Sequence, residues 1–162
     1  MSTTSKLRVQ IRWLIRRDMD KVLNIEGESF AVPWGEEDFL DHLRKKNCIG
    51  MVAERDKRIV GYMVYEMHHG ELRLLNMAVD PDFRRLGVAA QMVQKIKGKL
   101  SQQRRKSITI MLGDDNLSGQ LFFQSQDFWC DATMPGYFNG QDGYHMFFQL
   151  PSELTGEQPE WE

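Results

Sequence analysis

The chain has 162 residues, of which 41% are hydrophobic and 27% are charged, a composition typical of one soluble globular domain. A formal net charge of −2 argues against a general nucleic-acid-binding protein, since such proteins are usually clearly basic. Two cysteines are too few for a disulfide scaffold and favour a reducing, cytoplasmic location, and we expect neither a membrane span nor a signal peptide.

The N-terminal part of the chain is predicted to begin with a half-buried strand over residues 7–13, where apolar residues up to Trp13 alternate with polar ones. Asp18 is placed to cap a helix. The segment 28–34 interrupts this helix, because Pro33 favours an extended conformation for the residue before it. The elements expected after this loop are a helix over residues 35–46 and a hairpin of two strands over residues 48–54 and 58–67.

The middle of the chain carries the most informative pattern. Residues 72–79, LRLLNMAV, form a dense apolar run typical of a strand buried on both faces. A basic loop over residues 84–89, RRLGVA, leads into a helix whose apolar positions recur every four residues from 88 to 100. The first turn of a helix attracts anions, and Gly87 lets a large anion approach the backbone, so the loop predicts a pyrophosphate cradle. The alternative is a surface turn with two solvated arginines.

The C-terminal part is predicted to hold a strand over residues 107–112, followed by a helix that Asn116 opens. Leu117 and Leu121 are expected to place this helix on the core, because they lie one turn apart. Two final strands are expected over residues 129–133 and 144–150, joined by a loop rich in glycine that also contains a proline.

These elements predict the fold class and the domain organisation. Helices alternate with strands and a β pair closes the chain, so we expect an α/β or α+β fold with a mixed sheet. Residues 1–150 are predicted to form a single domain. Residues 151–162, PSELTGEQPEWE, contain two prolines and four glutamates, and they are predicted to be a disordered acidic tail.

Four stretches together resemble the GCN5-related N-acetyltransferases, the GNAT superfamily. They are the R-x-x-G-x-A loop after Met77-Ala78-Val79, the sequence SFAVPW at 29–34, Asn116 opening a helix that ends near Phe128, and GYF…GYHMFF near the end. Within the superfamily the chain is most similar to bacterial ribosomal-protein-alanine N-acetyltransferases. The resemblance covers residues 8–150. It implies a mostly antiparallel twisted sheet flanked by helices, with splayed central strands, and acetyl-CoA as co-substrate.

The resemblance also implies which residues bind the two substrates. Asn116 can alternatively be a plain helix N-cap, and the acceptor loop can alternatively be a hydrophobic staple between two helices. The implied cofactor-binding residues are Met77, Ala78, Val79, Arg84, Arg85, Gly87, Val88, Ala89, Ala90 and Asn116. The implied acceptor-binding residues are Phe30, Pro33, Trp34 and Tyr137.

The sequence departs from the family at the positions that usually move protons. Relatives carry a glutamate base five residues before the asparagine and a tyrosine acid seven residues after it, whereas this chain has Met111 and Phe123. Tyr137 is the preferred replacement, with packing as a loop aromatic the alternative. Glu28 is expected to be solvated and His145 to be structural.

The function predicted from these observations is transfer of acetyl from acetyl-CoA to an amine by direct attack on the thioester. By resemblance, the acceptor is a protein N-terminal α-amine, that of a ribosomal protein. The alternatives are a small-molecule amine acetyltransferase and a catalytically silent acyl-CoA-binding module. His68 and His69 make a poor chelate because neighbours on a strand point to opposite faces, so no metal is expected. No nucleic acid or membrane partner is expected.

Overall fold

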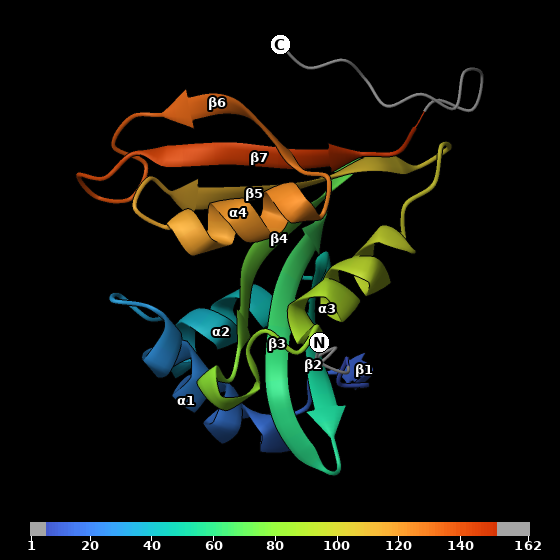
Figure 1. The fold of residues 1–162 in the computed structure, drawn as a ribbon, viewed down its shortest axis with the longest axis vertical. Coiled ribbons are helices and arrows are strands. Elements are labelled where there is room, and N and C mark those ends of the chain that lie inside the picture. The colour runs from blue at the N-terminus through green and yellow to red at the C-terminus, as the bar shows by residue number, and fades with distance from the viewer. Residues whose placement is uncertain (1–5, 152–162) are drawn as a thin grey trace, which may run out of the picture. The chain divides into compact units, whose positions relative to one another are not determined.

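The structure is a computed structural model that describes residues 6–151. Within them seven strands form one sheet in the order β1-β2-β3-β4-β5-β7-β6 (Figure 1). The strands are β1 (Gln10–Trp13), β2 (Cys48–Arg55), β3 (Arg58–Met67), β4 (Gly70–Val79), β5 (Arg105–Gly113), β6 (Trp129–Met134) and β7 (Gly143–Gln149). The helices are α1 (Met19–Ser29), α2 (Glu36–Leu43), α3 (Val88–Lys97) and α4 (Leu117–Ser125), with short 3-10 turns at Arg16–Asp18 and Pro81–Phe83.

The strand pairing confirms the predicted fold class. β4 and β5 are parallel, whereas the pairs β1–β2, β2–β3, β5–β7 and β6–β7 are antiparallel. The ladder between β4 and β5 covers residues 70–74 and 105–110, so the last residues of both strands lie beyond it. The sheet is therefore mixed and mostly antiparallel.

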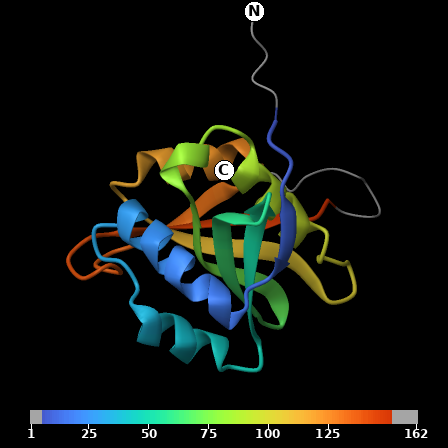
Figure 2. The ribbon, with the colours of Figure 1, turned by 90° about the horizontal axis from the view of Figure 1, so that it is seen from below.

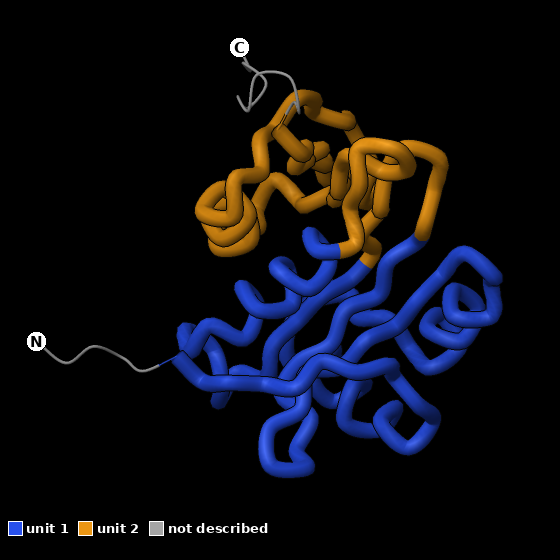
Figure 3. The backbone as a smooth tube through the Cα atoms, turned by 90° about the vertical axis from the view of Figure 1, so that its right-hand side faces the viewer, with its two compact units in different colours: residues 1–66, 76–98 blue, residues 67–75, 99–162 orange. Residues whose placement is uncertain are grey.

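The chain divides into two compact units (Figure 3). Unit 1 comprises residues 1–66 and 76–98, and unit 2 comprises residues 67–75 and 99–162. β4 contributes residues to both units. That residues 1–150 act as one domain stays a prediction, and the predicted acidic tail falls, apart from Pro151, outside the described residues.

The core of unit 1 is built on both faces of β3. A Cβ placed on Gly61 would lie 3.1 Å from Met92 Cε and 3.4 Å from Val88 Cγ1, so α3 packs closely on this face. Tyr62 points to the other face, where its ring contacts that of Phe39 of α2 edge-on at 5.8 Å. α1 and α2 thus cover the face opposite to α3 (Figure 2). The predicted apolar stripe of α3 is confirmed, since Val88, Met92 and Ile96 are buried.

Unit 2 has an aromatic core on one face of its strands. The ring of Phe123 in α4 contacts that of Phe128 at 5.0 Å, and Phe128 contacts Phe148 of β7 at 5.9 Å. The prediction that Leu117 and Leu121 face the core is wrong, because they are 62% and 56% exposed. Their spacing identifies a helix face, but the Phe123–Phe128 contact decides which face turns inward.

Candidate functional site

The loop that leads into α3 has the backbone geometry of an anion site. Arg85 and Gly87 adopt left-handed conformations with φ of 64° and 83°. Gly87 is the N-cap of α3, and no side chain caps the helix there, so the positive end of the helix carries N–H groups available to an anion. A Cβ on Gly87 would lie 2.9 Å from Lys6 Cγ, so only glycine fits this position without displacing a neighbour. The loop can therefore receive a phosphate group through its backbone.

Arg84 has a different role from the one that its charge suggests. Its guanidinium donates hydrogen bonds to the carbonyl oxygen of Val79 and to Ser29 Oγ, both at 3.0 Å. The side chain thus ties the loop to the end of β4 and to the end of α1. Arg85 is exposed and supplies charge at the loop itself. Of the two arginines, Arg84 fixes the shape of the loop.

The last residues of β4 and the first residues of α3 lie close to this loop in unit 1. Ala78, Val79 and Val88 are buried, whereas Met77 is half-buried. Ala89 and Ala90 are also half-buried in the first turn of α3. Unit 1 therefore brings together nine of the ten residues expected to bind cofactor, and the tenth, Asn116, belongs to unit 2.

Residues 30–34 after α1, the predicted acceptor segment, are partly packed and partly open. The Trp34 ring stacks on His42 of α2 at 4.5 Å and meets Phe39 edge-on at 5.1 Å. Phe30 is half-buried, and Pro33 is exposed. Trp34 therefore serves as the hydrophobic staple between the two helices, while Pro33 is exposed.

A buried carboxylate beneath this segment escaped the sequence reasoning. Glu26 of α1 is 2% exposed, and it accepts hydrogen bonds from the Tyr62 hydroxyl, from Asn76 Nδ2 at 2.7 Å and from the Trp34 backbone N–H at 2.9 Å. Burial and the nearby charge of Glu26 raise the pKa of Tyr62 far above its ordinary value, so the hydroxyl stays a donor. The network joins the acceptor segment to β4 one residue before Met77.

A helical signal could have identified Glu26. It follows Met19 by seven residues and Val22 by four, so it lies on the buried stripe of α1. An acidic residue on an apolar stripe requires internal hydrogen bonds, because burying an unpaired charge is costly.

Asn116 is a helix N-cap in unit 2. Its Oδ1 accepts a hydrogen bond from the Gly119 backbone N–H at 2.9 Å. A Cβ on Gly119 would lie 2.6 Å from Asn116 Nδ2, so glycine makes room for the capping amide. The structural alternative for Asn116 is thus real, and its use by a cofactor stays a prediction.

Tyr137 and Met111 lie together around Gly143 in unit 2. A Cβ on Gly143 would lie 2.8 Å from Met111 Cε and 3.0 Å from Tyr137 Cβ. Tyr137 is 53% exposed, and its ring rests edge-on against Phe138 at 4.8 Å. Phe123 is only 3% exposed in the aromatic core, so it does not present its ring to a ligand. The loop between β6 and β7 therefore places an accessible phenol beside Met111.

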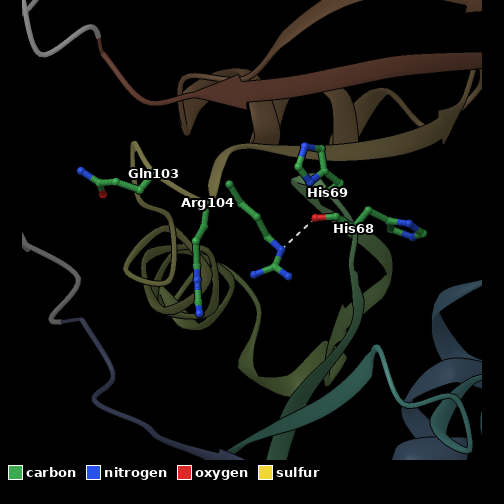
Figure 4. Close-up of a pocket in the computed structure, with 5 residues that line it drawn as sticks. His68, His69, Gln103 and Arg104 are labelled. Carbon is green, nitrogen blue, oxygen red and sulfur yellow. Dashed lines mark hydrogen bonds between the residues drawn. The ribbon is translucent and has the colours of Figure 1, made fainter.

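Two cavities are lined by residues that are not among the predicted site residues. In unit 2 a cavity of about 340 Å³ is lined by His68, His69, Gln103, Arg104 and Arg105, and Arg105 Nε donates to the His68 carbonyl oxygen at 2.8 Å (Figure 4). In unit 1 a cavity of about 420 Å³ lies between the N-terminal segment and α3, lined by residues that include Lys6 and Gln91. Within residues 6–151 no group of three or more His, Cys, Asp or Glu side chains could hold a metal ion. Nor does this part of the chain contain a helix long and apolar enough to cross a bilayer.

Comparison with known proteins gives the family. The sequence model of the acetyltransferase (GNAT) family matches residues 19–128. An uncharacterised N-acetyltransferase of Methanocaldococcus jannaschii is 26% identical over 145 residues, which cover 88% of this chain and 92% of that protein. The ribosomal protein bS18-alanine N-acetyltransferase of Haemophilus ducreyi is 23% identical over 133 residues, with coverage of 82% and 91%.

Solved structures share the fold. Ard1 of Thermoplasma volcanium superposes with a TM-score of 0.80 at 24% identity, covering 88% of this chain and 98% of that one. The ribosomal-protein-S18-alanine N-acetyltransferase of Escherichia coli gives 0.77 at 19% identity, with coverage of 88% and 94%. Arabidopsis thaliana NAA60, solved with acetyl-CoA, gives 0.76 at 12% identity, with coverage of 88% and 99%. Since the family model spans more than half of the chain, the protein belongs to the GNAT family of acetyltransferases.

Proposed function

We propose that this protein transfers the acetyl group of acetyl-CoA to the N-terminal α-amine of a protein, in the manner of the ribosomal-protein-alanine enzymes. The observation that carries the proposal is the loop before α3, where left-handed Gly87 leads into an uncapped helix N-terminus. This loop would hold the pyrophosphate of the co-substrate. Relatives named for acetylation of ribosomal protein bS18 support the choice of acceptor.

The other predicted residues have roles consistent with this function. The backbone of Met77, Ala78 and Val79 would hold the pantetheine arm and polarise the thioester carbonyl, and such stabilisation is usually the largest catalytic term. Asn116 would add a contact through Nδ2, since Gly119 engages its Oδ1. Phe30, Pro33 and Trp34 would frame the acceptor.

The chemistry suits an α-amine better than a lysine. An α-amine has a pKa of about 7.7–8.0, so a useful fraction is a free nucleophile at neutral pH, whereas a lysine near 10.4 needs a base far more. The amine nitrogen forms a bond to the thioester carbon, the carbon–sulfur bond breaks, and the sulfur leaves with the electron pair. The leaving thiol has a pKa of about 8.5 by analogy with cysteine, so it needs little help from an acid.

Tyr137 is proposed to contact the acceptor and to exchange a proton at the reacting centre. Its ring is accessible and its Cβ lies beside Gly143. Because the leaving thiol needs little acid assistance, we expect Tyr137→Phe to lower kcat by less than about tenfold, a smaller effect than loss of a general base. The matched control is Phe138→Leu, which changes the neighbouring ring and no proton.

The proposed location is the cytoplasm. Cys48 and Cys130 are both free thiols, as suits a reducing compartment. A ribosomal acceptor would be met there.

The test is thiol release from acetyl-CoA with short peptides that differ only in their first residue. Release that requires an alanine or serine start and stops with a blocked N-terminus is the expected result. Release with small amines alone would replace the peptide acceptor by a small-molecule one. No release with any acceptor, in a protein that binds acetyl-CoA, would overturn the proposed function.

A further inference from the structure

β6 contains a bulge that aims a carboxylate at a histidine of the neighbouring strand. The register between β6 and β7 shifts between Cys130 and Ala132, so Asp131 is the inserted residue. Its Oδ1 lies 2.5 Å from His145 Nδ1. Bulges occur next to active sites because they redirect a side chain, and here the redirected side chain orients an imidazole.

The register on the other side of β7 places His145 beside the position of the missing base. His145 pairs directly with Met111 of β5. Directly opposed residues of an antiparallel pair project from the same face, with Cβ atoms about 4.5–5.5 Å apart. By the family resemblance, Met111 stands where relatives carry the glutamate that accepts the proton. The imidazole therefore lies one strand away from that position.

On the face that carries His145, Thr109 and Phe147 are buried, so access is confined to the end where His145 lies. Ile108, Ile110 and Leu112 of β5 and their β7 partners face α4 and its aromatic core, so the alternate residues Met111 and His145 project from the opposite face. The His145 side chain is 32% exposed and that of Asp131 is 45% exposed. The pair is thus accessible.

The hydrogen bond decides which ring nitrogen acts as the base. An ionised carboxylate only accepts, so His145 Nδ1 carries the proton and Nε2 keeps its lone pair. The carboxylate holds this tautomer and stabilises the imidazolium that forms, the division of labour seen in Ser-His-Asp triads. Imidazole is the side chain that most often acts as a general base in enzymes.

Stability alone does not account for the arrangement. Exposed polar pairs of this kind contribute little to stability. A bulge also leaves one residue of the strand out of the ladder, and in this strand that residue is the one whose side chain orients His145.

We propose that His145, positioned by Asp131, is the general base of the acetyl transfer that the chain otherwise lacks. This inference rests on the proposed function. As the amine nitrogen bonds to the thioester carbon, its proton moves to His145 Nε2, the carbon–sulfur bond breaks, and the electron pair goes to sulfur. The imidazolium then returns the proton to the thiolate or to water, so protons and charge balance.

Titratable groups in contact with the ring and on neighbouring positions of β5 and β7 set the conditions of the test. Asp131 is in contact, and Tyr137 lies beside Gly143, two residues before His145 on β7. Asp115 Oδ1 lies 3.0 Å from the Cβ position of Gly113, two residues after Met111 on β5. Met111 itself does not titrate. The pH profile of a His145 variant therefore has to be compared with that of Tyr137→Phe.

The experiment measures kcat, KM and their pH dependence for wild type, His145→Gln and Asp131→Asn with the peptide that the wild type acetylates. We expect His145→Gln to lower kcat about 10²–10³-fold and to abolish the inflection that the base gives to the kcat–pH profile, with unchanged Kd for acetyl-CoA. Asp131→Asn should lower kcat by a smaller factor than His145→Gln, because the imidazolium that forms in the reaction loses its counter-charge. The control His69→Gln removes an exposed histidine elsewhere in unit 2, and it should change neither kcat nor the pH profile.

A second variant separates catalysis from folding. Met111→Glu in the His145→Gln background puts a carboxylate opposite the lost ring, and we expect it to recover at least tenfold in kcat. If the wild type is active and His145→Gln has the same kcat and pH profile, the role of His145 is overturned. The proposed function is then unaffected. A wild type with no turnover would instead overturn the proposed function.

Discussion

Two carboxylates, one in each unit, have opposite surroundings. Glu26 in unit 1 is 2% exposed and accepts from Tyr62, Asn76 and the backbone of Trp34. Asp131 in unit 2 has a side chain 45% exposed and contacts His145. A buried carboxylate with its acceptor sites engaged holds structure in place, whereas an exposed one beside an imidazole can assist proton transfer.

The comparison extends to the residues around each carboxylate. In unit 1 the predicted acceptor segment, α1 and β4 meet at Glu26, so this residue positions other groups. In unit 2, Asp131 and His145 lie on strands β6 and β7, which pair through their backbones. The side chains of these two residues remain accessible. Losing Glu26 should therefore reduce stability, and losing Asp131 should reduce rate.

The largest expected effect on stability belongs to Glu26→Ala. Tyr62 and Asn76 would each lose a partner while buried, and each unpaired buried group costs about 1–3 kcal/mol, so we expect the free energy of unfolding to fall by about 3 kcal/mol. Urea denaturation measures it. Glu28→Ala, on the exposed side of the same helix, is the control and should change little. Equal losses in the two variants would refute the structural role of Glu26.

Two glycines with the same backbone conformation test whether the loop before α3 binds the co-substrate. Gly87 in unit 1 and Gly70 in unit 2 have φ of 83° and 84°, but only Gly87 has a neighbour, Lys6, within reach of an added Cβ. Both alanine variants should lose about 1 kcal/mol of stability, since φ is positive in each. Only Gly87→Ala should raise the Kd for acetyl-CoA, by about tenfold or about 1.4 kcal/mol. Titration calorimetry measures the Kd for acetyl-CoA. A similar rise of this Kd in Gly70→Ala would contradict the role of the loop before α3 in binding.

Acid titration tests a further buried carboxylate of unit 1. Burial by itself would raise the pKa of Asp80, but the Lys21 ammonium at 2.9 Å, the Asp82 N–H and the Arg58 charge together lower it below its ordinary value. The folded state therefore binds fewer protons than the unfolded state, whose Asp has a pKa of about 3.9. This contribution to stability is present above that value and is lost as the pH falls through the lower, folded pKa.

The measurement is the free energy of unfolding between pH 6 and pH 2, in wild type and in Asp80→Asn. We expect the wild type to lose stability below about pH 4 and Asp80→Asn to show a shallower decline, with Asp20→Asn, exposed at the start of α1, as the control. Parallel curves for wild type and Asp80→Asn would contradict the prediction.

The parts of the site that the sequence predicts are those set by neighbours in the chain. The end of β4, the basic loop and the stripe of α3 follow from local turn chemistry and periodicity, and the structure has each of them. Hydrophobic periodicity predicts burial less reliably at the ends of edge strands. Trp13 alternates with polar residues as a buried residue would, yet it is 69% exposed at the end of the edge strand β1.

The parts that the sequence does not reveal depend on distant pairing. Glu26 contacts Tyr62 and Asn76 across separations of 36 and 50 residues. The helical periodicity can therefore indicate that Glu26 is buried, but it cannot identify its partners. The bulge at Asp131 contains neither glycine nor proline, so no residue type announces it. Only the register shows that His145 faces Met111.

The smallest expected effect on stability is that of Asp131→Asn, and it separates the two carboxylates most sharply. The pair with His145 is exposed, and such pairs contribute about 0–1 kcal/mol, so we expect the free energy of unfolding to change by no more than about 1 kcal/mol. Urea denaturation of Asp131→Asn beside Glu26→Ala makes the measurement. A loss as large as that of Glu26→Ala would make Asp131 a structural residue. A small loss of unfolding free energy with a clear fall in kcat means that the bulge in β6 serves the reaction. The contact between Asp131 and His145 then stabilises the transition state more than it stabilises the folded protein.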